Sequence, residues 1–138
     1  LGFGRHTVLQ HEAISAMASD PIVFAMANPY PEVEPAGIEK IARVIATGKS
    51  DFPNQINNML CFPGFFRGLL DSRARTVNDE MKLAAARAIA GVVGPDELHE
   101  DYLIPSVFNR RVVTAVKNAV LLAAQQTGEA RRIVRPSI

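Results

Sequence analysis

The chain has 138 residues, 48% of them hydrophobic, which is enough for one compact domain and too few for two domains to be expected. Its 15 lysines and arginines against 14 aspartates and glutamates give a formal net charge of +1, which excludes a broad basic surface for nucleic acid or an anionic membrane. A small metabolite is therefore as good a partner as any macromolecule.

Two further features bear on location. The apolar runs are far shorter than the roughly 20 residues of a membrane-spanning helix, and residues 1–17 lack a basic start followed by an apolar block. The single cysteine, Cys61, cannot form an internal disulfide. We therefore expect a cytoplasmic protein with no membrane partner.

The first expected element is a short helix over residues 10–18, with Ile14, Met17 and Ala18 on one face. Asp20-Pro21 should end it.

Two apolar runs of strand length follow, over residues 22–27 and 43–48. The first has no polar alternation, which predicts a strand buried on both faces, as in a parallel sheet. The prolines of residues 28–32 predict a loop, and Pro35 predicts the first turn of a short helix over residues 35–41. Strand, helix and strand in this order predict a βαβ crossover.

The rest of the chain has the apolar periodicity of helices. Over residues 56–70, Pro63 should kink the expected helix or restart it. Residues 78–93 form the clearest helix, and residues 109–126 form another, capped by Asn109. The side chains expected inward on this last helix are Val113, Val116, Val120 and Ala124. The basic residues 129–135 are expected to form a solvated tail or a strap across a neighbouring domain.

Several motifs that carry chemistry are absent from the sequence, among them a G-x-G-x-x-G after a strand, a P-loop and a pair of Cys or His at metal spacing. The acidic residues 96–101 carry carboxylates that could bind a hard cation such as Ca²⁺ or Mg²⁺. Their place after Gly94-Pro95 favours a different interpretation, in which they supply negative charge at the N-terminus of a helix. The residues alone therefore indicate no catalytic motif, and we expect no metal ligand within this chain.

Side-chain amides follow both expected strands. Asn28 comes directly after the first strand, and residues 54–58 hold four amides shortly after the second. Ligands of open α/β sheets bind at the carboxyl ends of the strands, so these loops are where a site is expected. Taken alone, Asn28 is more often a turn former and Asn57 more often a helix cap.

Two segments carry a resemblance to a known family. Residues 20–32 (DPIVFAMANPYPE) and 46–64 (ATGKSDFPNQINNMLCFPG) resemble malic enzymes of the bacterial type. The similarity continues through residues 78–90 and 101–105. Tyr30 stands where the family commonly has a small residue such as threonine.

The resemblance implies a metal-dependent oxidoreductase that uses NAD or NADP, with Mg²⁺ or Mn²⁺, to convert malate into pyruvate and carbon dioxide. It implies that Asn28 and Asn57 contact malate, and that Asn28 and Asn58 contact the cofactor. The family's tyrosine and lysine acid–base pair, its metal carboxylates and its glycine-rich turn would precede Leu1. The chain alone is therefore expected to be inactive, and the complete enzyme to be a homo-oligomer.

The expected fold class is α/β, with residues 1–138 as the C-terminal portion of a malic-enzyme-like NAD(P)-binding domain. This would be a partial Rossmann-like domain with a short parallel sheet and a helix-rich C-terminal half. The alternative function is a non-catalytic nucleotide- or metabolite-binding module. A shared malate site predicts that Asn28 and Asn57 lie within roughly 10 Å of each other, since each amide must reach one small ligand at about 2.9 Å.

Overall fold

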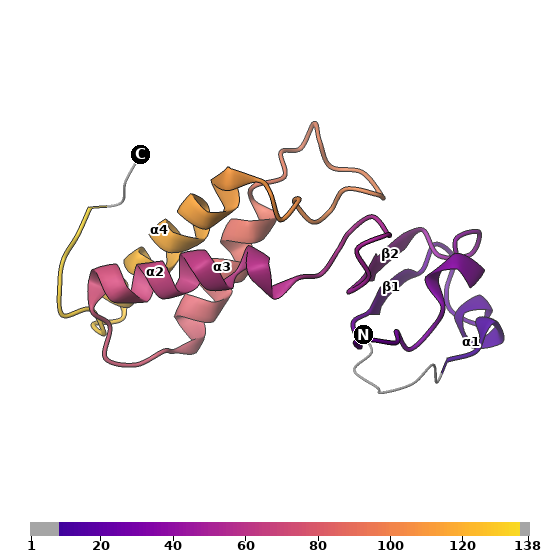
Figure 1. Cartoon of the computed structure of the whole chain (residues 1–138), viewed down its shortest axis with the longest axis horizontal. Coiled ribbons are helices and arrows are strands. Elements are labelled where there is room, and N and C mark those ends of the chain that lie inside the picture. The colour runs from indigo at the N-terminus through magenta and orange to yellow at the C-terminus, as the bar shows by residue number, and fades with distance from the viewer. Residues whose placement is uncertain (1–8, 136–138) are drawn as a thin grey trace. The chain divides into compact units, whose positions relative to one another are not determined.

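The computed structural model describes residues 9–135, which form two compact units where the chain length predicts one. The first unit contains the residues up to Ile56 together with Glu97–Ile104. The second contains Asn57–Asp96 and the residues from Pro105 onward. Figure 1 shows the strands in the first unit and the three long helices in the second.

A parallel pair of strands organises the first unit. β1 (Ile22–Ala25) pairs with β2 (Val44–Thr47), with Ile22 opposite Val44 and Ala25 opposite Thr47. This pairing confirms the expected α/β class. The connection between the strands contains only the 3₁₀ turn η1 (Pro35–Gly37), although a helix over residues 35–41 was expected. Gly37 works against such a helix, because glycine disfavours helix by about 1 kcal/mol relative to alanine.

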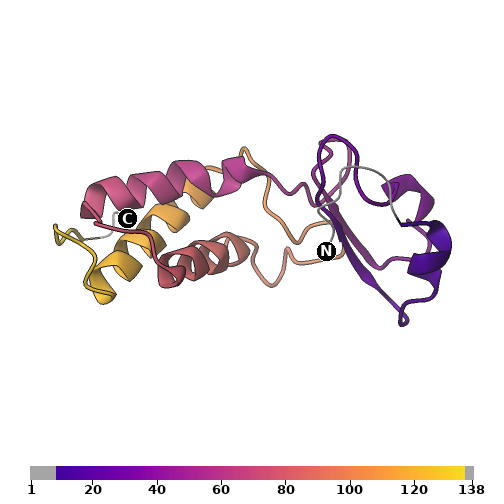
Figure 2. The same ribbon diagram turned by 90° about the horizontal axis from the view of Figure 1, so that it is seen from below.

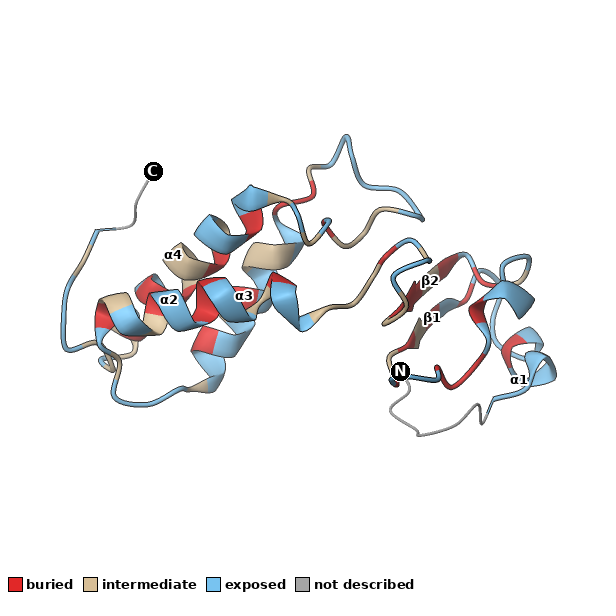
Figure 3. Ribbon diagram, in the orientation of Figure 1, coloured by how far each residue is buried: buried red, intermediate tan, exposed pale blue. Residues whose placement is uncertain are grey.

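The core of this unit covers only one face of β1. Val23 and Ala25 are buried with Ile14 and Ile38, whereas Ile22 is 61% exposed. The expectation that β1 is buried on both faces is therefore wrong for the described residues. The buried and exposed stretches of this unit can be followed in Figure 3.

The first helix is shorter than expected. α1 (His11–Ser15) buries Ile14, but Met17 lies beyond the end of the helix and is 47% exposed. Gln10 makes no side-chain cap bond, and one helical turn is marginal without a cap because nucleation is unfavourable.

The second unit consists of the 3₁₀ turn η2 (Asn58–Leu60) and three helices, α2 (Phe62–Ser72), α3 (Asp79–Ala90) and α4 (Arg110–Gln126). Pro63 lies in the first turn of α2, so it restarts the helix there. Asn78 and Asn109 cap α3 and α4 by accepting hydrogen bonds from Met81 N–H and Arg111 N–H. Helix α4 packs against both α2 and α3 (Figure 2).

Two glycines let α2 approach the backbone of α4. A Cβ on Gly64 would lie 2.6 Å from the carbonyl oxygen of Val113, and one on Gly68 would lie 2.7 Å from that of Lys117. Gly64, Gly68 and Ser72 are four residues apart, so they lie along one ridge of the helix, and all three are buried. Small residues therefore line the part of α2 that meets the backbone of α4, and Phe65 is the large side chain that α2 buries.

Two large apolar side chains of α2 are left exposed. Phe66 is 56% exposed and Leu70 is 72% exposed, whereas Phe65 is buried at 9% exposure. On α4, Val116, Val120 and Ala124 are buried as expected, but Val112 is buried at 2% exposure and Val113 is 39% exposed. The contact of Gly64 with the backbone at Val113 leaves no room for a side chain between the helices there.

The basic segment after α4 folds back onto its own unit. The N–H groups of Arg131 and Arg132 both donate to the carbonyl of Ser72 at 3.0 Å, and Gln125 Nε2 donates to the carbonyl of Val134 at 2.7 Å. The segment thus returns to the ends of α2 and α4 in its own unit, where a solvated tail or a strap across a neighbouring domain was expected.

The first prediction tests the glycine contact. Gly68→Ala places a methyl group against the Lys117 carbonyl and should destabilise the second unit by about 1 to 3 kcal/mol, the usual penalty of overpacking. Urea unfolding followed by far-ultraviolet circular dichroism measures this, because α2, α3 and α4 supply most of the helical signal. Gly37→Ala is the control, since its Cβ would meet nothing within 4 Å. Equal midpoints for the two variants would contradict the close contact.

The second prediction concerns the buried amide of Asn54, which donates to the carbonyls of Ile45 (3.2 Å) and Glu100 (2.7 Å) and accepts from Leu103 N–H (2.7 Å). Asn54→Ala leaves these three backbone groups unpaired, and each one that stays buried should lower the free energy of unfolding by about 1 to 3 kcal/mol. Amide hydrogen exchange of Leu103 should then speed up by about tenfold or more. Asn58→Ala, which removes an exposed amide, is the control. Unchanged protection of the Leu103 amide against hydrogen exchange in Asn54→Ala would contradict the structural role of Asn54.

Candidate amide site at the carboxyl end of the strands

Asn28 lies at the carboxyl end of the parallel sheet. It follows β1 by a few residues, its peptide bond to Pro29 is cis, and its side chain is exposed. Within residues 9–135 its amide makes no hydrogen bond, so the alternative of an amide bonded to its own turn is not what the structure shows. The amide is available to a ligand.

Gly48 is the reason that Asn28 can lie there. It directly follows β2, and a Cβ on it would lie 2.8 Å from Asn28 Oδ1 and 3.0 Å from Nδ2. Such distances are essentially never seen for a real Cβ, so any other residue would displace the amide. The loops after the two strands thus meet at one place, as the position of ligand sites in open α/β sheets predicts.

The charged side chains near this place are paired. Lys49 Nζ lies 3.1 Å from Glu34 Oε1 and 5.5 Å from the centre of the Phe52 ring. Directly before β2, at its amino end, Arg43 pairs with Glu100 at 3.1 Å. A backbone hydrogen bond together with this pair lowers the pKa of the Glu100 carboxyl. The amide of Asn28 is therefore a polar group without an internal partner at the carboxyl ends of the described strands.

Asn57 and Asn58 belong to the second unit, where they begin η2. Asn57 Oδ1 accepts from Met59 N–H at 2.9 Å, so the helix-cap interpretation of Asn57 is confirmed. The cap uses its oxygen only, and no contact within the described chain uses its Nδ2 group. Asn58 is exposed, and its side-chain amide makes no hydrogen bond within the described residues.

The amides of residues 54–58 therefore do not all have the same role. Asn54 is 4% exposed, and its bonds to Ile45, Glu100 and Leu103 are internal. Its partners at Glu100 and Leu103 are more than forty positions away in sequence, so no local pattern could reveal this structural role. That Asn28 and Asn57 share one ligand stays a prediction.

The remaining polar candidates do not form a site. Residues 96–101 form turns with no helix after them, so the expected helix N-terminus is wrong. Within residues 9–135 no group of three or more His, Cys, Asp or Glu residues could hold a metal ion. Partial burial raises the pKa of the Cys61 thiol, which disfavours the thiolate form.

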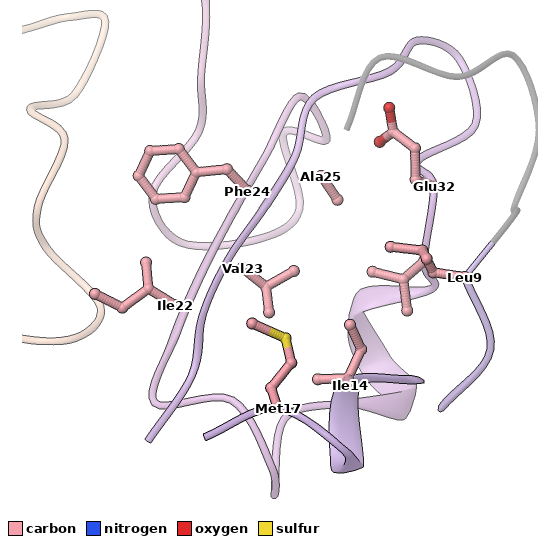
Figure 4. Close-up of a pocket in the computed structure, with 9 residues that line it drawn as sticks. Leu9, Ile14, Met17, Ile22, Val23, Phe24, Ala25 and Glu32 are labelled. Carbon is pink, nitrogen blue, oxygen red and sulfur yellow. The ribbon is translucent and has the colours of Figure 1, made fainter. Parts of the chain in front are cut away.

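A hollow of about 80 Å³ lies against β1, but its lining is almost wholly apolar (Figure 4). Its one charged member is Glu32, whose carboxylate accepts from the N–H of Ala27 at 3.2 Å. Such a hollow offers no set of donors for a dicarboxylate. No helix within the described residues has the length and apolar character needed to cross a bilayer.

Comparison with known proteins gives concordant results. The chain is 61% identical over 132 residues to an NAD-dependent malic enzyme of Geobacillus stearothermophilus, a match that covers 96% of this chain and 28% of that protein. It is 55% identical over 129 residues to a bifunctional malic/malolactic enzyme of Bacillus subtilis, covering 93% of the chain and 32% of that protein. The chain thus spans about a third or less of these relatives.

Among solved structures, the malic enzyme from Pyrococcus horikoshii superposes with a TM-score of 0.90 and 47% identity, covering 97% of this chain and 31% of that one. The malic enzyme of Entamoeba histolytica superposes with a TM-score of 0.87 and 37% identity, covering 92% of this chain and 26% of that one. The family model described as "Malic enzyme, NAD binding domain" matches residues 3–125. The chain therefore belongs to the NAD-binding domain family of malic enzymes.

Proposed function

We propose that this chain supplies substrate and cofactor contacts to a malic enzyme, which converts malate into pyruvate and carbon dioxide with NAD or NADP. The observation that carries the proposal is the free amide of Asn28, which lies against Gly48 at the carboxyl ends of two parallel strands. This is where ligands bind in open α/β sheets, and the chain belongs to a family of malic enzyme domains.

The asparagines have separate tasks in this proposal. Asn28 contacts both malate and the cofactor, Asn57 contacts malate and Asn58 contacts the cofactor. Because the oxygen of Asn57 is occupied by Met59 N–H, only its Nδ2 group remains to bind a ligand, and that group can only donate. A hydrogen-bond donor suits a malate carboxylate, which can only accept.

Neutral amides suit this site for an electrostatic reason. A malate dianion beside a cationic metal and an oxidised nicotinamide already has its charge compensated. Amides fix the orientation of the substrate without adding charge, which lowers the entropic part of the barrier.

The cofactor and metal differ in how they fit this chain. The amides of Asn28 and Asn58 fit contacts to a dinucleotide, which accepts a hydride when bound. The described residues contain no carboxylate group suited to Mg²⁺ or Mn²⁺, so the chain itself holds no metal in this proposal. Orientation of the substrate is thus the task of these residues.

The proposed partner is the remaining N-terminal part of a complete enzyme, which is a cytoplasmic homo-oligomer. Two observations support further protein around this chain. The relatives are about three times as long, since the match covers 28% of the Geobacillus enzyme. Phe66 and Leu70 also leave a broad apolar strip exposed along α2, which is typical of a surface that other protein covers.

The third prediction is that the 138-residue chain does not turn over malate by itself. No residue in it is assigned acid–base chemistry, and acid–base and metal contributions are each worth factors of roughly 10² or more. Purified chain with malate, NAD or NADP and Mn²⁺ should produce no reduced cofactor above the level of an Asn57→Ala sample. Metal-dependent production above that level would contradict the proposal.

The fourth prediction separates a malate ligand from a helix cap. In the complete enzyme, Asn57→Asp keeps an oxygen that accepts from Met59 N–H but replaces the donor with a negative charge facing the malate carboxylate. The kcat/KM for malate should fall by a factor of about 100 or more, because the loss includes a charged hydrogen bond and adds repulsion. The Kd of the dinucleotide should change little.

Asn109→Asp is the matched control, because Asn109 Oδ1 caps α4 by accepting from Arg111 N–H. It changes the same group at a cap with no assigned ligand. Full malate activity in Asn57→Asp would show that Asn57 is a cap alone and would overturn its assignment as a malate contact.

A further inference from the structure

Four arginines gather at one end of the second unit. Two of them directly follow α2, and two belong to the segment that returns after α4. Although the chain as a whole carries a formal net charge of +1, this end carries a local excess of cations. The members of this arginine cluster are Arg73, Arg75, Arg131 and Arg132.

Backbone hydrogen bonds hold the two segments together. Arg131 N–H and Arg132 N–H both donate to the Ser72 carbonyl at 3.0 Å, and Arg75 N–H donates to the Glu129 carbonyl at 3.1 Å. Since successive Cα atoms are about 3.8 Å apart, these bonds place the four backbones within about 10 Å of one another. The cluster is therefore built by the fold, and does not depend on chance side-chain positions.

The guanidinium groups of the cluster are free to bind. All four side chains are exposed, and none has an ion pair or hydrogen bond within residues 9–135. The nearby carboxylates Asp71 and Asp79 already pair with Arg67 at 2.7 Å and Lys82 at 2.9 Å. Their charge is thus not available to the cluster.

Helix ends do not neutralise the cluster either. Glu129 and the C-terminal ends of α2 and α4, each end equivalent to about half a negative charge, offset only about two of the four positive charges. A surplus of positive charge remains within one Debye length, about 8 Å at physiological salt.

We propose that the arginine cluster binds an anion that carries two or three linked phosphates. Guanidinium groups bind phosphate oxygens through paired N–H donors, and four of them on backbones within about 10 Å of one another exceed what one phosphate can engage. A chain of phosphates offers acceptors along this span. Both inorganic polyphosphate and the phosphates of a nucleotide have this chemistry.

The fifth prediction is tested by nuclear magnetic resonance titration of the ¹⁵N-labelled 138-residue chain with inorganic tripolyphosphate in 0.15 M salt. Saturable shifts should be confined to the amides of residues 72–75 and 129–132. The double substitution Arg131→Gln and Arg132→Gln should weaken binding at least tenfold, since hydrogen bonds to charged groups are each worth about that factor.

The matched control is the double substitution Arg87→Gln and Arg110→Gln. It removes the same charge from exposed arginines on α3 and α4, and binding should stay within twofold. Circular dichroism checks that each variant is folded, and Arg73→Gln with Arg75→Gln provides a second pair from the cluster. Arginine-to-lysine changes keep the charge and should weaken binding less than the glutamine changes do.

Three ligand arms complete the test. Orthophosphate should bind more weakly than tripolyphosphate. A nucleoside triphosphate that binds as tightly as tripolyphosphate supports recognition of the phosphate chain alone, and tighter binding supports an added contact to the base. Absence of saturable shifts, or equal weakening in the cluster and control variants, would overturn the proposal.

Discussion

The amide of Asn54 is the constraint on which the first unit depends. Its three hydrogen bonds join β2 to the loop that follows and to the segment at Glu100 and Leu103, far away in the chain. The residue has a positive φ of 56°, which asparagine tolerates better than most residues. Because the loop is held in this way, Ile56 N–H reaches the carbonyl of Thr47 at 2.8 Å and the chain leaves the sheet at a defined point.

The second unit depends on a different kind of constraint, namely the absence of side chains. Gly64 and Gly68 bring α2 to the backbone of α4, so that packing is made by main-chain atoms and by Val116 and Val120. The consequence is that α2 buries Gly64, Gly68 and Ser72 together with Phe65, while Phe66 and Leu70 stay exposed. Dispersion contacts at such short separation compensate for the small size of the inner face.

Much of the architecture could be predicted from the sequence. The apolar run before Asn28 predicts β1, because Asp20-Pro21 and Asn28-Pro29 bound it, and asparagine followed by an amphipathic segment predicts the caps of α3 and α4. The position of Asn28 at the carboxyl end of the sheet follows from the same pattern.

The missed features have a common cause, which is that they depend on contacts distant in sequence. Hydrophobic periodicity assumes that large side chains face inward, so it places Phe66 inside and overlooks Gly68. Similarly, Asn54 and Asn57 look alike as members of one polar stretch, yet Asn54 is buried and bonded to Leu103, whereas Asn57 caps η2 through its oxygen. Local pattern cannot separate them, since burial is decided by the fold.

The segment Glu97–Ile104 limits how parts of this domain could be exchanged by genetic recombination. It lies between α3 and α4 in the chain, yet it belongs to the unit of the strands, so the chain passes from one unit to the other after Ile56, Asp96 and Ile104. A crossover between residues 54 and 100 would separate Asn54 from the Glu100 and Leu103 groups that it binds. Neither unit is one continuous stretch of the chain, so neither can be exchanged as a single uninterrupted segment.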